Sequence, residues 1–89
     1  MPEIARFYGI IIRMYMEALT MHNKPHFHAY YQNFVGVIGI ENIDLLAGNL
    51  PKPQLRLTLA WAEIHQTELM TAWDLLQKGQ PPIKIEPLN

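Results

Sequence analysis

The residues best suited to chemistry are histidines that lie close together in the chain. His26 and His28 flank a single phenylalanine, and His22 lies shortly before them. If this segment is a strand, side chains two residues apart point the same way, so the two imidazoles can meet one metal ion or one phosphate. Zinc sites that do catalysis usually have three protein ligands. The metal-ligand candidates are therefore His22, His26 and His28, with a divalent metal as the possible cofactor, although paired strand histidines are more often polar surface.

A second group of chemically useful residues emerges when neighbouring strands are placed in phase. Their outward face would carry Arg13, Tyr15, His26, His28 and Tyr30. Tyrosine rings stack on unpaired bases, arginine pairs with phosphate and histidine transfers protons near neutral pH, so this face suits single-stranded RNA or ribonucleolytic chemistry. Tyrosine and arginine also favour protein interfaces, and an uncovered sheet face often lies against a partner. Protein contact is the favoured interpretation, ahead of nucleic acid.

His65 is the third histidine with a possible catalytic role, beside His26 and His28. It has Glu63 and Glu68 nearby, and Glu68, three residues on, can pair with it if the segment is helical. A helical histidine beside carboxylates is usually a surface residue, so a catalytic role requires that His65 meet the other two in space. The chain has no serine and no cysteine, and it lacks both GxxxxGK and GxGxxG, which disfavours nucleophilic hydrolysis and nucleotide binding.

Length and composition limit the classes of protein that can position these residues. The chain has 89 residues, which predicts a single domain spanning 1–89. Seven basic and eight acidic residues give a net charge of −1, so no basic excess indicates a strong nucleic-acid binder. The absence of cysteine excludes disulfides and thiolate zinc sites. A domain this small buries only a modest share of its surface on folding, which favours a homo-oligomer as a possible state.

Hydrophobic patterning predicts strands in the first half of the chain. The run 7–16 is rich in β-branched and aromatic residues and reads as one strand that turns Tyr8, Ile10, Ile12, Met14 and Met16 toward the core. A second strand over 26–31 should turn its Phe27 and Ala29 inward. The polar residues 32–33 predict a hairpin to a third strand over 34–41. The turn-rich segment 42–53 can add a short further strand.

The second half of the chain predicts one long helix. Pro53 suits a first helical turn, and no glycine or proline follows before Gly79, so the helix should span 53–78 with Trp61 and Trp73 as core or interface anchors. Residues 80–89 form an extended proline-rich tail. The expected fold is α+β, a small antiparallel sheet of three or slightly more strands packed on one long C-terminal helix. Without a signal peptide or membrane span, a cytoplasmic location and no membrane contact are expected.

The chain resembles the small prokaryotic domain of unknown function numbered 4160. The resemblance rests on the segments PEIARFYGIIIRMYM, HNKPHFHAYY, FVGVIGIE and the helix stretch that begins LRLTLAWAEIH. Its most specific marker is His-Asn-x-Pro-His-Phe-His-Ala at 22–29, where Lys24 stands at a position that is often proline in the family, and Trp-Ala-Glu-x-His at 61–65 is the second. The resemblance brings no established activity. Genes of this type often lie beside another small gene in pairs that resemble toxin-antitoxin modules, which implies a protein partner encoded nearby.

Three functions are therefore open. The favoured one is an interaction component of a toxin-antitoxin-like pair that contacts its partner protein, and possibly RNA, through Arg13, Tyr15, His26, His28 and Tyr30. The first alternative is an enzyme, either a ribonuclease with His26 or His28 as general acid and base and Arg13 on the phosphate, or a metal-assisted hydrolase. The second alternative is metal binding without catalysis through His22, His26 and His28.

Overall fold

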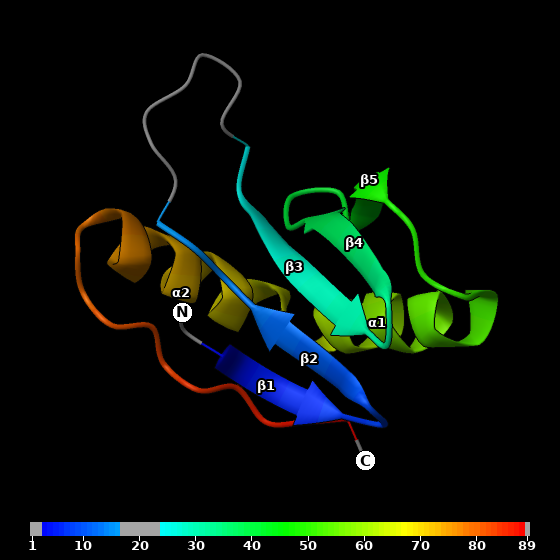
Figure 1. Ribbon diagram of the computed structural model, residues 1–89. Helices are drawn as coiled ribbons and strands as arrows, with labels where there is room; N and C mark the ends of the chain where they lie inside the picture. The colour runs from blue at the N-terminus through cyan, green and yellow to red at the C-terminus, as the bar shows by residue number, and fades with distance from the viewer. Residues whose placement is uncertain (1–2, 17–23, 89) are drawn as a thin grey trace.

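The computed structural model describes residues 3–16 and 24–88, which fold into one antiparallel sheet and two helices (Figure 1). The elements are β1 (Glu3–Phe7), β2 (Ile10–Arg13), β3 (His26–Tyr31), β4 (Phe34–Gly39), β5 (Asp44–Gly48), α1 (Lys52–Ile64) and α2 (Gln66–Gln77). The strands lie in the order β1-β2-β3-β4-β5, and every neighbouring pair is antiparallel. Both helices lie behind the sheet in Figure 1, and its other face is turned to the viewer. The predicted α+β class is confirmed, with five strands in the sheet.

The run 7–16 is not one strand, because a tight turn divides it. Tyr8 and Gly9 have φ values of 48° and 79°, and β1 and β2 pair on either side of them. Two successive positive φ values are typical of the hairpin turn whose twist matches that of the strands. Glycine adopts this conformation without steric cost, while Tyr8 remains 58% exposed at the tip. The chain therefore gains an N-terminal strand that its hydrophobic pattern did not predict.

The core lies between the sheet and the helices, and strand alternation fills it only in part as predicted. Tyr8, in the turn between β1 and β2, and Met16, beyond the end of β2, are exposed and not in the core. Ile10, Ile12 and Met14 are fully buried, and so are Phe27 and Ala29 on β3. They form one cluster with buried residues of both helices. The predicted hairpin between β3 and β4 is present, with residues 32–33 as its turn. The alternate residues of β2 and β3 consequently face away from the helices.

The predicted single helix over 53–78 is wrong, because the chain forms two helices that meet at His65. This residue leaves the helical conformation, with φ −111° and ψ 24°. The side-chain amide of Gln66 donates hydrogen bonds of 2.8 and 3.1 Å to the carbonyls of Ile40 and Glu41, just after β4. The break is therefore tied to the sheet by a long-range contact, and neither glycine nor proline marks it.

The C-terminal segment after α2 runs along the outer side of β1 (Figure 1). The backbone N–H of Ile85 donates to the carbonyl of Ile4 at 2.9 Å, and the Ile85 side chain is buried. The indole N–H of Trp61 donates to the carbonyl of Glu86 at 2.8 Å. Residues 78–88 form no helix or strand, yet they cover one edge of the sheet. In the described ranges, no helix is long and apolar enough to cross a membrane.

Candidate functional site

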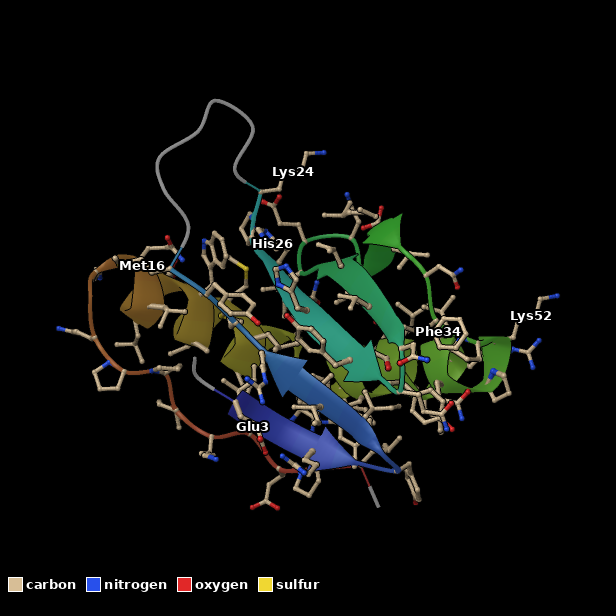
Figure 2. All side chains as sticks on the ribbon, viewed as in Figure 1. Glu3, Met16, Lys24, His26, Phe34 and Lys52 are labelled. Atoms are coloured by element: carbon tan, nitrogen blue, oxygen red, sulfur yellow. The ribbon has the colours of Figure 1, made fainter. Side chains whose placement is uncertain are left out.

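The structure places the five predicted contact residues together on the sheet face that the helices leave uncovered. Arg13 lies directly opposite His28 in the pairing of β2 with β3, so both side chains project from the same face. Tyr15 follows the end of β2, while His26 and Tyr30 flank His28 along β3. All five side chains are partly buried. Figure 2 shows His26 at the beginning of β3, close to Lys24. We call this group, Arg13, Tyr15, His26, His28 and Tyr30, the aromatic face.

Three rings of the aromatic face hold one another in place. The rings of Tyr15 and His28 are 4.8 Å apart and nearly perpendicular, at 87°. His28 and Tyr30 lie almost parallel, at 18°, with their centroids 6.3 Å apart. The hydroxyls of Tyr15 and Tyr30 are 2.5 Å apart and share a hydrogen bond in which either can donate. The side chains are thus fixed before any ligand binds, which lowers the entropy cost of binding.

His26 is positioned by the helix layer as well as by its own strand. Its ring lies 5.1 Å from that of Trp73 on α2 and 5.4 Å from that of His28. Its Nδ1 is 2.6 Å from the carbonyl oxygen of Lys24, and because a carbonyl can only accept, Nδ1 must carry the proton. In the neutral ring the lone pair is then on Nε2. The Lys24 carbonyl therefore fixes the tautomer of the neutral His26 ring.

The sequence did not reveal that Trp73 supports the aromatic face. Its helical spacing indicated a core or interface anchor, and the ring is indeed 6% exposed. The same end of α2 also reaches Tyr15, because the Gln77 amide donates to the Tyr15 carbonyl at 3.4 Å. No sequence pattern signals a contact between residues so far apart in the chain. The aromatic face thus depends on α2 for part of its geometry.

A charged group that includes Glu3, Arg6 and Arg13 lies beside the aromatic face, where Glu3, labelled on β1 in Figure 2, is opposite Arg13 in the strand pairing. Both Glu3 oxygens accept hydrogen bonds from Arg6, at 2.8 Å from Nη2 and 3.1 Å from Nε. This bond is the main cause of a lowered pKa for the Glu3 carboxyl, and it raises the pKa of Arg6. The guanidinium carbon of Arg13 lies 5.8 Å from the centre of the Tyr30 ring. This is within the range of a cation–π interaction.

His65 does not lie in the aromatic face but in the turn between the two helices. Its ring is 5.5 Å from that of Trp61, and its Nδ1 donates to Glu68 at 2.6 Å. The pairing with Glu68 is the one that helical spacing indicated. Of the three catalytic candidates, the structure therefore joins His26 with His28 and gives His65 different neighbours. The fourth histidine, His22, lies outside the described residues.

Neither of the two largest cavities among those found involves a histidine. One, of about 320 Å³, lies between β1 and the C-terminal segment, with Ile4 and Ile85 among its walls. The other, of about 200 Å³, lies between α2 and the same segment and includes Thr71 and Ile83. In residues 3–16 and 24–88, no group of three His, Cys, Asp or Glu side chains is placed to hold a metal ion. The expected metal set of His22, His26 and His28 extends beyond these ranges.

The fold and the aromatic face together define a small α+β protein with one sheet face covered by the helices and the other left uncovered by them. The model of the family described as Domain of unknown function (DUF4160) matches residues 9–74, and the chain belongs to this family. The matched region contains the whole aromatic face and both helix segments up to Asp74. No curated protein and no solved structure matches the chain.

Proposed function

We propose that this protein is an interaction protein that binds a partner protein through the aromatic face. The observation that carries the proposal is the mutual packing of Tyr15, His28 and Tyr30 on the sheet face that the helices leave uncovered. Tyrosine and arginine are enriched among the residues that dominate binding energy at protein interfaces. Rings that are already held in place lose little freedom when a partner binds.

The partner that the family resemblance implies is the product of a neighbouring gene, in a toxin-antitoxin-like pair that acts in the cytoplasm. This would make the protein the component that is recognised through its sheet face, with RNA as a further ligand of the complex. A small chain with a net charge of −1 fits a protein interface better than a long nucleic-acid interface, which needs several basic contacts.

Co-expression with the neighbouring gene, followed by affinity measurements on single variants, tests the proposal. Tyr30→Ala removes a ring from the centre of the aromatic face, and we expect it to weaken partner binding by about 30-fold or more, as for a typical interface hot spot. Tyr8→Ala is the matched control, because Tyr8 lies at the tip of the first hairpin and is 58% exposed. Equal affinities for the two variants, or no co-purification of the wild-type pair, would contradict the proposal.

A second candidate function is supported by the orientation of His26. The Lys24 carbonyl fixes the His26 proton on Nδ1, and His26 lies beside His28, which is itself opposite Arg13, so either histidine is a candidate general acid or base. This arrangement would suit metal-independent cleavage of RNA, with Arg13 on the phosphate. A ribonuclease assay with wild type, His26→Ala and His28→Ala tests this chemistry, since cleavage at the parent rate by both folded variants would rule it out.

A further inference from the structure

We propose that Arg13 is the anchor of the aromatic face and that it binds a carboxylate from an acidic segment of the partner protein. The inference rests on the proposed function, because it names the chemistry that the partner must present there. It follows from three features of the structure: the charge neighbours of Arg13, its aromatic support and the sparse charge of the face.

The carboxylate nearest in the strand pairing is already occupied. Glu3 lies opposite Arg13 in the pairing of β1 with β2, where an ion pair would be expected. Both Glu3 oxygens instead accept hydrogen bonds from Arg6, in a two-pronged contact. In residues 3–16 and 24–88, the ion pairs are Arg6 with Glu3 and His65 with Glu68. The charge of Arg13 contributes to the lowered pKa of Glu3, but within residues 3–16 and 24–88 no carboxylate forms a close ion pair with its guanidinium.

The position of Arg13 suits recognition by its planar group. The side chain is partly buried, and its guanidinium carbon lies 5.8 Å from the centre of the Tyr30 ring. An aromatic ring restrains arginine and leaves its N–H groups directed outward, and those groups match the two oxygens of a carboxylate. Because Arg13 lies opposite His28, it stands beside the rings that the partner is proposed to cover. Arginine in such a position is a typical source of interface binding energy.

The sparse charge of the face favours a carboxylate over an RNA backbone. Arg13 is the one permanent cation of the aromatic face, and the strand that crosses its centre, β3, contains no lysine or arginine. An RNA strand carries a phosphate on every nucleotide, and its affinity depends on several such contacts. A single aspartate or glutamate within an otherwise uncharged contact surface needs only one cationic side chain. The ligand that fits this face is therefore one acidic side chain of a partner protein, flanked by residues that cover the tyrosines.

The test uses a glutamate hexapeptide and a uridine hexanucleotide as probes of the full-length protein. The readouts are the NMR shift of the Arg13 side-chain Nε–H and the dissociation constants of wild type, Arg13→Gln and Arg13→Lys. Arg56→Gln is the matched control, because Arg56 is an exposed arginine on α1. We expect the peptide to shift the Arg13 signal and Arg13→Gln to bind it about tenfold or more weakly. Arg13→Lys should lose part of the affinity because it lacks the planar fork, and Arg56→Gln should bind as wild type.

Two results would overturn the proposal. One is an Arg13 signal that does not move at peptide concentrations up to about 10 mM, where millimolar affinities are visible. The other is a shift with the oligonucleotide and none with the peptide, which would assign Arg13 to phosphate. Partner affinity separates this inference from the proposed function. If Tyr30→Ala weakens the complex and Arg13→Gln does not, the face is the interface and Arg13 is not its anchor.

Discussion

The substitution Ile85→Ala tests how the C-terminal segment contributes to the fold. The side chain is 5% exposed and belongs to the core cluster. Truncating a buried isoleucine to alanine costs about 2–5 kcal/mol of unfolding free energy. Two cavities, of about 320 and 200 Å³, border Ile85, so its packing is incomplete and the lower part of that range applies, about 2–3 kcal/mol. In a domain of this size the midpoint of thermal unfolding should fall by about 10–20 °C.

The matched control for Ile85→Ala lies two residues earlier in the same segment. Ile83 is 60% exposed, so Ile83→Ala should change the free energy of unfolding by less than about 0.5 kcal/mol. Urea denaturation followed by the fluorescence of Trp61 and Trp73, which are both buried, measures the two variants in parallel. Both substitutions keep the backbone N–H that bonds Ile4. Equal losses, or no loss for Ile85→Ala, would refute the conclusion that the segment is anchored through the Ile85 side chain.

Two further predictions concern the backbone conformation of two glycines and the loss of stability at low pH. A Cβ at Gly48, where φ is +70°, would lie 2.1 Å from the Val35 carbonyl oxygen, so Gly48→Ala should cost more than about 3 kcal/mol. Gly79 has φ +77° with open space around it, so Gly79→Ala should cost about 1 kcal/mol, and equal losses in urea denaturation would be contrary to this account. The Glu3 carboxyl has a lowered pKa because of Arg6. Its contribution to the free energy of unfolding is therefore complete above the ordinary carboxyl pKa, and it is lost as the pH falls through the pKa of the folded protein. Glu3→Gln should therefore reduce the loss of unfolding free energy as the pH falls. An unchanged loss would show that the Glu3–Arg6 pair contributes nothing.

The composition of the aromatic face could be predicted from sequence because strands have a period of two. Once Phe27 and Ala29 are assigned to the core, His26, His28 and Tyr30 must project from the other side. The same rule does not give the distances between side chains. The shared hydrogen bond of the tyrosine hydroxyls and the contact of His26 with Trp73 depend on how the strands and α2 come together. Those contacts decide whether the side chains of the aromatic face are held in place before a partner binds.

The two errors in the predicted fold have different physical causes. The first hairpin was missed because Tyr8, in a run of apolar residues, adopts the left-handed conformation, and the only local signal is Gly9. The break at His65 has no local signal, since it depends on hydrogen bonds from Gln66 to carbonyls beyond the end of β4. A turn with its own glycine can be sought in a sequence, whereas a break stabilised by a distant strand requires the tertiary structure.

The most direct test of the central claim is NMR of the protein with labelled tyrosine rings, alone and in complex with its co-expressed partner. The chain has four tyrosines, which Tyr→Phe variants assign. Tyr15 and Tyr30 lie on the aromatic face, Tyr8 lies at the hairpin tip, and Tyr31 packs against the core cluster. We predict that the partner shifts the signals of Tyr15 and Tyr30 and leaves those of Tyr8 and Tyr31 in place. A complex in which Tyr15 and Tyr30 do not move would show that the partner binds elsewhere, and the account would be wrong.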